Sequence, residues 1–141
     1  MNYLLDTCVI SELAKSKPNP TLVEWAVRQD ASRCYISSIT LGEIQKGISK
    51  LPDSTRKSDL QTWLNRDLRE RFVGRTIAIA DNEALLWGTM MASAEAEGKP
   101  VPVVDSLLAA AALFHGMTLV TRNTRDMQAS GVKLLNPWES D

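Results

Sequence analysis

The sequence predicts an α/β fold in which a central, mostly parallel sheet is flanked by helices. Three observations support this prediction. Short apolar runs alternate along the chain with segments of helical periodicity, as expected for strands joined by helical crossovers. The chain has 141 residues, which is close to the commonest size of one domain. It contains no internal repeat, low-complexity tract or linker, so we expect residues 1–141 to form a single domain.

The first half of the chain contains two short apolar runs, each followed by a helical pattern. Residues 3–5 end directly before Asp6 and are long enough only for a short strand. Asn19 is a good helix cap and Pro20 suits the first helical position, while Pro52 ends a later helix. The expected elements are a strand at 3–5, a helix at 9–13, a helix starting at 19–20, a strand at 34–36 and a helix at about 40–51.

The second half continues this alternation. An apolar stripe of period 3.6 between residues 60 and 72 predicts a long helix that starts at Ser54 or Thr55 and ends at Gly74. Asp81 is expected to cap the helix that follows. The other expected elements are a strand at 76–79, a helix at 81–98, a helix at 105–115, and strands at 117–121 and 132–135.

The composition excludes several classes of protein. Sixteen basic and seventeen acidic residues give a net charge of −1, which excludes nucleic-acid binding through bulk positive charge but leaves a local basic patch open. One histidine and two cysteines are too few for a zinc site rich in either residue. The histidine, His115, stands at a predicted helix end, where we expect it on the surface.

Nothing in the sequence indicates export or membrane insertion. The first six residues lack the basic segment of a signal peptide, and the longest apolar stretch, 107–114, is far shorter than the roughly 20 residues that span a bilayer. We therefore expect a cytoplasmic protein. Thiols stay reduced in that compartment, so Cys8 and Cys34 are expected to be free and buried.

Four acidic residues follow predicted strands, at the positions where ligands bind in open α/β sheets. The ligand crevice of such sheets lies at the carboxyl ends of the strands. Asp6 follows the first strand directly, and Glu43 lies one helical turn beyond the second. Asp105 follows an apolar pair of valines, and Asp126 lies in the loop after the strand that ends at Thr121. These four side chains are therefore expected to converge on one crevice.

Each acid also has a simpler interpretation when it is taken alone. Asp6 and Asp105 could cap helices, and Asp126 could belong to an Asx turn. Thr40 and Glu43 have the spacing of a capping box. The shared position of all four acids favours a cluster, as do the apolar residues beside Asp6 and Asp105, because isolated buried carboxylates are costly.

A cluster of carboxylates suits a hard cation, Mg²⁺ or Mn²⁺. Such a site commonly acts on phosphate esters, because the metal neutralises phosphoryl oxygens and lowers the pKa of a bound water without help from histidine. Catalysis through a serine–histidine or cysteine–histidine pair would have to use His115, which is the only histidine and stands at a predicted helix end. We therefore do not expect this kind of catalysis. The glycine-rich phosphate-binding motifs of nucleotide-binding proteins are absent from the sequence.

Four segments, in order and correctly spaced, resemble PIN-domain ribonucleases. They are LLDTCVISE at 4–12, SSITLGEI at 37–44, VDSLLAA at 104–110 and LVTRNTRDM at 119–127. One such segment would be weak evidence, whereas four in register span essentially the whole chain. The nearest subgroup is the VapC and FitB type, the toxin half of bacterial toxin–antitoxin pairs.

This resemblance implies a three-layer PIN-like fold and a set of site residues. Met127 stands where the family usually has phenylalanine, an exchange of one apolar packing residue for another. The implied ligands of Mg²⁺ or Mn²⁺ are Asp6, Glu43, Asp105 and Asp126, with Thr7, Thr121 and Asn123 in support.

The resemblance also implies an activity and partners. The activity is a Mg²⁺-dependent endoribonuclease, in which metal-activated water attacks an RNA phosphodiester. The implied partners are a second copy of the chain and an antitoxin that blocks the acidic groove, with larger assemblies on operator DNA held through the antitoxin.

Three alternatives remain open on the residues alone. A receiver-type signalling module would have paired acids after the first strand and a lysine after the last motif strand, where this chain has Leu5-Asp6 and Thr121-Arg122. A phosphatase of the haloacid-dehalogenase type needs Asp-x-Asp, and Cys8 takes the second position. A PIN-like scaffold that only binds is disfavoured by the intact set of four acids.

Basic residues beside the motifs are candidates for RNA contacts. Arg122 and Arg125 flank the last motif and are placed to meet phosphates near the site. The segment between Arg56 and Arg75 carries a local charge of +3, but its basic residues do not fall on one helical stripe. A solvated helix face is the simpler interpretation of that segment.

Overall fold

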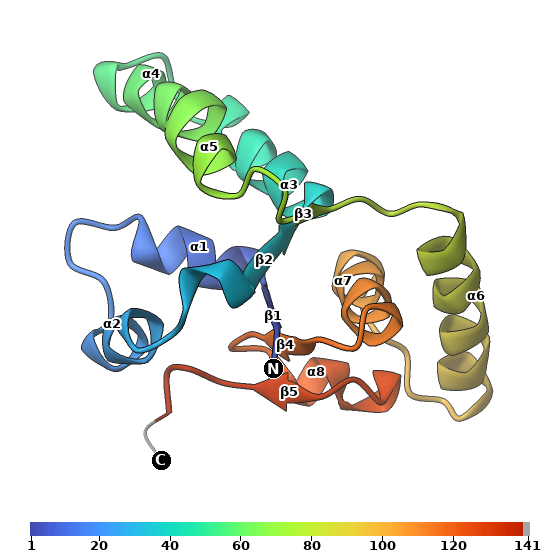
Figure 1. Ribbon diagram of the computed structural model, residues 1–141. Coiled ribbons are helices and arrows are strands. Elements are labelled where there is room, and N and C mark those ends of the chain that lie inside the picture. The colour runs from blue at the N-terminus through green and yellow to red at the C-terminus, as the bar shows by residue number, and fades with distance from the viewer. Residues whose placement is uncertain (140–141) are drawn as a thin grey trace.

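Five parallel strands form the centre of the computed structural model, which describes residues 1–139 (Figure 1). Their order across the sheet is β3-β2-β1-β4-β5, and every neighbouring pair is parallel. Every strand therefore ends at the same edge, as the sequence predicted. The strands are β1 (Tyr3–Leu5), β2 (Cys34–Ser37), β3 (Thr76–Ile77), β4 (Thr118–Val120) and β5 (Leu134–Leu135).

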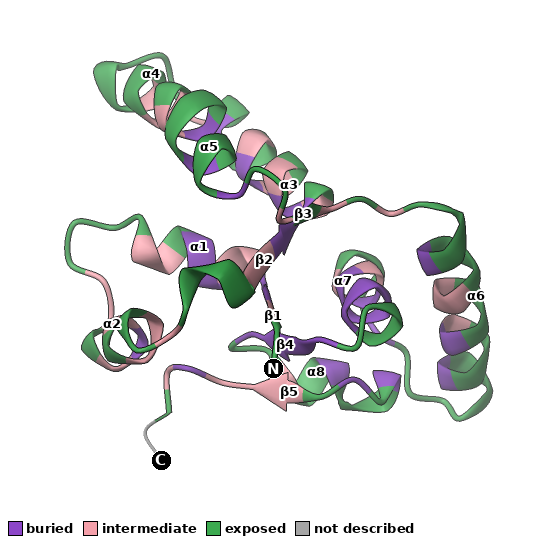
Figure 2. Ribbon diagram, viewed as in Figure 1, coloured by how far each residue is buried: buried purple, intermediate pink, exposed green. Residues whose placement is uncertain are grey.

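Helices cover both faces of the sheet, which confirms the three-layer arrangement (Figures 1 and 2). The helices are α1 (Thr7–Leu13), α2 (Pro20–Val27), α3 (Ser38–Ser49), α4 (Thr55–Thr62), α5 (Arg69–Arg71), α6 (Asp81–Ala96), α7 (Val103–Phe114) and α8 (Thr124–Met127). Short 3₁₀ turns lie at η1 (Ala31–Arg33) and η3 (Gln128–Ser130), and a π-helical turn lies at η2 (Trp63–Leu68).

Two hydrophobic cores lie on opposite sides of the sheet because neighbouring strand residues point to opposite faces. Leu4 and Leu119 belong to the core under α6 and α7, whereas Leu5 and Val120 belong to the core under α1–α4. The four consecutive alanines of α7, residues 109–112, are fully buried. Their small side chains let α7 lie close to both the sheet and α6, with which it makes extensive contact.

Two helix boundaries differ from the sequence prediction. Helix α7 begins at Val103 rather than Asp105, because Pro102 precedes it and its fixed φ suits a helix start. Val103 and Val104 are therefore helical and exposed, and Asp105 lies in the first turn. The prediction that Asp81 caps α6 is also wrong, because Asp81 is the first residue of the helix and Ala80 occupies the capping position.

The predicted long helix after residue 54 is confirmed, because α4, the π-helical turn η2 and α5 form one continuous helical run that starts at Thr55, whereas β3 is shorter than expected. Leu64, Leu68 and Phe72 are buried, as their spacing predicted. Helices α3 and α4 form an arm that projects from the sheet and has a largely exposed outer surface (Figures 1 and 2).

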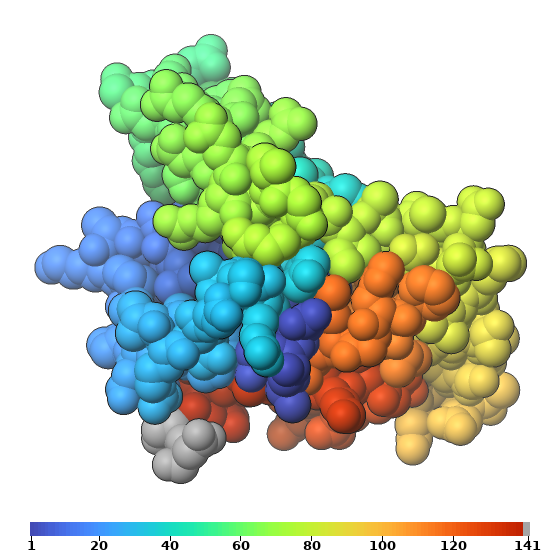
Figure 3. Space-filling view, viewed as in Figure 1, coloured from blue at the N-terminus to red at the C-terminus, as the bar shows by residue number. Residues whose placement is uncertain are grey.

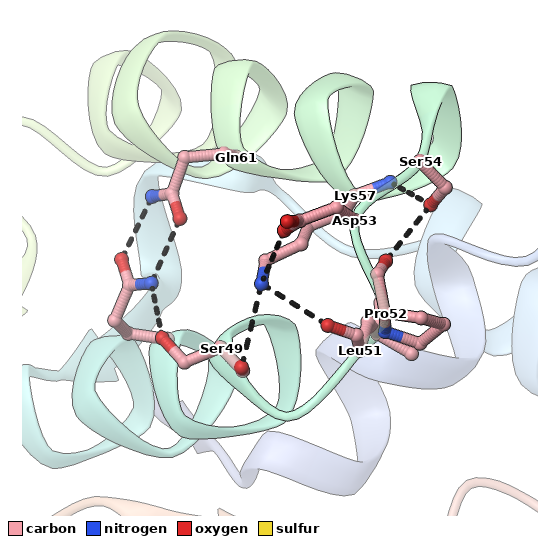
Figure 4. Close-up of polar contacts among 8 residues, drawn as sticks. Ser49, Leu51, Pro52, Asp53, Ser54, Lys57 and Gln61 are labelled. Atoms are coloured by element: carbon pink, nitrogen blue, oxygen red, sulfur yellow. Dashed lines mark hydrogen bonds and ion pairs between the residues drawn. The ribbon is translucent and has the colours of Figure 1, made fainter.

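A cluster of polar contacts holds this arm together (Figure 4). Lys57 Nζ donates to the carbonyl of Leu51 at 3.0 Å and lies 3.4 Å from the carboxylate of Asp53. One turn further along α4, the amides of Gln45 and Gln61 donate to each other at 2.8 and 2.7 Å. These bonds hold α4 against α3, in addition to the apolar packing of Ile48 and Leu64 in the core beneath.

The expectation for the histidine is confirmed, and that for the cysteines is only partly correct. His115 is exposed at the end of α7, as predicted, and its Nε2 also lies 3.1 Å from the carboxylate of Glu83 in α6. A backbone amide hydrogen bond, together with His115, holds the pKa of Glu83 below its ordinary value. Cys8 and Cys34 are free as predicted, but they are half-buried rather than buried. Within residues 1–139, none of the helices has the length and apolar character needed to cross a bilayer.

Met127 provides a test of the packing described here. Its side chain is fully buried in the core that also contains Leu108 and Leu119. We expect Met127→Ala to lower the free energy of unfolding by about 2–5 kcal/mol, because it leaves a cavity. Met127→Leu, which nearly preserves volume, should cost less than about 1.5 kcal/mol. Urea denaturation measures both, and equal losses in the two variants would contradict the packing.

Candidate functional site

Asp6 lies at the carboxyl end of the central strand β1 and is almost completely buried. Its Oδ1 accepts a hydrogen bond of 2.7 Å from the amide of Thr7, because Asp6 is the N-cap of α1. Its Oδ2 accepts a hydrogen bond of 2.7 Å from the hydroxyl of Thr121, which follows β4. Asp6 therefore caps a helix, as the simpler interpretation held, and also belongs to a polar cluster.

Glu43 reaches the same edge of the sheet from α3. The hydroxyl of Thr7 donates to Glu43 Oε1, which ties the start of α1 to the first turns of α3. The hydroxyl of Thr40, one turn before Glu43, lies 3.1 Å from that of Thr7. The capping-box interpretation is wrong, because Ser37 caps α3 and accepts a hydrogen bond from the amide of Ile39.

Asp105 shows that the four predicted acids share one neighbourhood. Its carboxyl, in the first turn of α7, is partly buried, and its pKa is raised to about 6, with burial as the largest cause. The negative charges of Asp6, Glu43 and Asp126 supply the rest of this rise, in that order of size. Asp126 itself lies in the short helix α8 and is exposed, so the prediction of an Asx turn or loop at this position is wrong.

The donor set at this edge is made of carboxylate oxygens, which suit a hard divalent cation. Among residues 1–139, no three side chains of the metal-binding types His, Cys, Asp or Glu already lie close enough together to hold an ion. Asp6 is fixed by two hydrogen bonds, whereas Asp126 is exposed on its short helix. Coordination would therefore require the less restrained carboxylates to close toward Asp6, and it would relieve the repulsion that raises the pKa of Asp105.

The predicted supporting residues act in different ways. Thr121 contacts Asp6 directly, as described above, whereas Asn123 reaches the cluster through its backbone, whose amide donates to Thr121 Oγ1 at 3.0 Å. Arg122 packs its guanidinium 4.5 Å from the centre of the Trp138 ring. Arg125 is exposed on α8. An RNA contact by either arginine stays a prediction.

Two residues near the site were missed by sequence reasoning. Thr40 is fully buried beside Thr7, and its i,i+3 spacing from Glu43 would have placed both on one helix face. The thiol of Cys8 lies 3.7 Å from Asp6 Oδ2, and burial followed by the charge of Asp6 raises its pKa. Cys8 is therefore protonated at neutral pH in the metal-free protein.

Comparison with known proteins identifies the family. The PIN domain family matches residues 3–130. The chain belongs to this family. It is 32% identical to the VapC ribonuclease Y4jK of Sinorhizobium fredii over 96% of the chain and 97% of that protein. It is also 32% identical, with the same coverage of both proteins, to toxin FitB of Neisseria gonorrhoeae. The structure of FitAB bound to an IR36 DNA fragment superposes with a TM-score of 0.93 at 31% identity, covering 99% of this chain and 97% of the other.

These similarities confirm the PIN-like fold expected from the four sequence segments, and they rule out the receiver and phosphatase folds as descriptions of this chain. The roles of the individual acids are not decided by similarity of the whole chain. They depend on the geometry described above.

The raised pKa of Asp105 predicts how the metal-free protein responds to pH. The folded protein binds the Asp105 proton more tightly than the unfolded chain does, so stability should fall as the pH rises from about 4 to about 6 and then level off. Asp105→Asn should remove this contribution. Since the group is partly exposed, we expect a gain near 1 kcal/mol, or about 2–4 °C in Tm, at pH 7 in EDTA.

Thermal unfolding of the wild type and the variant across this pH range measures the effect. Asp67→Asn, which alters an exposed carboxylate on η2, is the matched control and should leave the pH dependence unchanged. A lower Tm for Asp105→Asn in EDTA would mean that Asp105 does not sit among repelling charges.

Proposed function

We propose that this protein is a divalent-metal-dependent endoribonuclease and the toxin half of a toxin–antitoxin pair. The observation that carries the proposal is that Asp6, Glu43 and Asp126 lie near enough to Asp105, in a PIN domain, for their negative charges to help raise its pKa. The similarity to a VapC ribonuclease over nearly the whole length of both proteins supports RNA as the substrate. An enzyme acting on RNA in this way would work in the cytoplasm.

Asp6, Glu43, Asp105 and Asp126 would hold Mg²⁺ or Mn²⁺. When bound, the ion would neutralise phosphoryl oxygens and lower the pKa of a water molecule to give a nucleophile. Four ionised carboxylates carry a charge of −4, which repels a polyanion. One divalent ion would leave −2 and two would leave zero, so RNA could approach only the loaded site.

The other side chains of the cluster would hold the carboxylates in place. The Thr7 amide and the Thr121 hydroxyl occupy one lone pair on each oxygen of Asp6 and fix the plane of its carboxylate. The Thr7 hydroxyl donates to Glu43 and keeps that side chain turned toward Asp6. Such orientation of ligands by hydrogen-bonding partners commonly contributes 10–100-fold, roughly, to metal affinity or activity.

The proposed partners are a cognate antitoxin and a second copy of the chain. The similarity to FitAB bound to DNA supports an assembly in which the antitoxin blocks the acidic groove and carries the toxin to operator DNA. Val103 and Phe114, at opposite ends of α7, are 60% and 46% exposed. Eleven residues span three helical turns, so both lie on one face of α7, where a partner copy could cover them.

Cleavage assays test the catalytic proposal. The protein, freed of any partner, should cut RNA in Mg²⁺ or Mn²⁺ and lose this activity in EDTA. Asp6→Asn and Asp105→Asn should each reduce the rate at least about 100-fold, because each removes the charge of a ligand. Glu95→Gln changes an exposed acid of α6 and should have no effect. Full activity in EDTA or in either aspartate variant would refute the metal mechanism, and a protein that binds RNA without cutting it would be a non-catalytic scaffold.

A further inference from the structure

Arg122 stands at the rim of the acidic cluster, by which we mean the carboxylates of Asp6, Glu43, Asp105 and Asp126. It directly follows Thr121, whose hydroxyl donates to Asp6 at 2.7 Å, and its side chain is exposed. A guanidinium carries a permanent positive charge and can bind a carboxylate through two parallel hydrogen bonds. Charge alone would therefore draw Arg122 into the cluster, where it would compete with a divalent cation.

The guanidinium of Arg122 nevertheless lies apart from these carboxylates. None of the ion pairs in the described chain, residues 1–139, includes it. Burial and then the charges of three acids raise the pKa of Asp105, and no positive charge offsets them. The guanidinium carbon lies instead 4.5 Å from the centre of the Trp138 ring, over its face. This is a cation–π contact, for which tryptophan is the best partner among the aromatic side chains.

Strand pairing and a tight turn bring the two side chains together. Val120 of β4 pairs with Leu135 of β5, so the segments that leave these two strands run side by side. The side chain of Asn136 then accepts a hydrogen bond of 2.9 Å from the amide of Trp138. Pro137, between them, is fully buried and has a fixed φ. The turn at 136–139 therefore sets the direction in which Trp138 leaves the sheet.

The ring of Trp138 is held by packing. It packs against the core under α1–α4, and Figure 3 shows the red end of the described chain beside the light-blue α2. Residues of α2 and of the segment after β5 also line one hollow together. The buried indole N–H finds no acceptor among residues 1–139, so a hydrogen bond of the ring does not explain its position. The fold thus presents the face of Trp138, rather than its polar group, to Arg122.

Glu12, near the end of α1, draws Arg122 in the same outward direction. Its carboxylate accepts hydrogen bonds from Lys15 Nζ at 2.9 Å and from the amide of Asn19 at 3.0 Å. The bond from Lys15 is the largest cause that lowers the pKa of Glu12, and the positive charge of Arg122 adds a small contribution. Glu12 lies six residues, or about 9 Å of helix, beyond Asp6. The guanidinium is therefore held toward the end of α1 and away from the cluster.

We propose that Trp138 is a positioning residue, which holds Arg122 at the rim and keeps the acidic cluster open to a divalent cation. Without the ring, the guanidinium would turn to the carboxylates and occupy the place of the cation with its own charge. The inference rests on the proposed metal-dependent function and deepens it, because it gives the turn at 136–139 a part in metal binding.

The test is Mn²⁺ binding, measured from the EPR signal of the free ion as protein is added. Trp138→Ala should weaken binding about fivefold, because the cluster is then open in only a fraction of the molecules. Trp138→Phe keeps an aromatic face and should have a smaller effect. Changing Arg122 to alanine as well as Trp138 should restore the affinity to within about twofold of the wild type. A ring that only stabilised the fold would give no such rescue.

Trp25→Ala is the matched control. Trp25 packs against the same core, where its ring meets that of Tyr3 edge-on with centres 5.3 Å apart. Among the described residues, no arginine lies over its face. This change should lower the Tm, as Trp138→Ala should, but leave the Mn²⁺ affinity unchanged when binding is measured well below both values of Tm.

A second readout needs no metal. Exchange of the Arg122 Nε–H proton with water, measured by NMR in EDTA, reports whether the guanidinium is bound to carboxylates. It should slow about fivefold in Trp138→Ala, because the guanidinium then donates charge-assisted hydrogen bonds to the cluster.

An unchanged Mn²⁺ affinity in Trp138→Ala would overturn the inference, as would a loss that Arg122→Ala does not restore or that Trp25→Ala reproduces. Unchanged proton exchange at Arg122 would overturn it whether or not Mn²⁺ binds. The two proposals can fail separately. A wild type that binds no Mn²⁺, together with slowed exchange in Trp138→Ala, would refute the metal site but leave Trp138 as the residue that positions Arg122.

Discussion

The hydrogen bond from Thr121 Oγ1 to Asp6 Oδ2 joins residues that lie 115 positions apart in the sequence. It forms because β1 and β4 are adjacent parallel strands whose carboxyl ends meet at one edge of the sheet. Asp6 is almost fully buried there, and a buried carboxylate without partners would be strongly destabilising. The Thr7 amide and the Thr121 hydroxyl supply those partners and hold the Asp6 carboxylate in one position at the edge of the sheet.

The rest of the fold stabilises an edge that carries unfavourable charge. Leu4 and Leu5 point to opposite faces of the sheet, and each anchors a separate hydrophobic core. The buried alanine run of α7 packs against the sheet and begins only four residues beyond Asp105 in the sequence. Apolar burial on both faces thus holds the site residues in place despite their mutual repulsion, and a bound cation would remove that repulsion.

Much of this arrangement could be predicted from the sequence, because strand ends and apolar periodicity are local signals. The positions of Asp6 and Asp126 after short apolar runs predicted that both would lie at one sheet edge. The start of α7 at Val103 was missed because Asp105 resembles a helix cap, whereas Pro102 determined the helix start. The role of Thr40 depends on the approach of α1 to α3, and the Arg122–Trp138 contact depends on where the chain runs after β5. Neither is visible in local sequence.

The central claim is that four carboxylates at this edge form one divalent-cation site, and paramagnetic broadening by Mn²⁺ in amide NMR spectra tests it most directly. Substoichiometric Mn²⁺ should broaden first the resonances of residues around the cluster, such as Thr7, Asp105 and Thr121. Arg33 and Lys133, at the opposite edge, should remain sharp, and excess Mg²⁺ should reverse the effect. Broadening centred on other acids such as Glu95, or spread evenly over the surface, would contradict the claim.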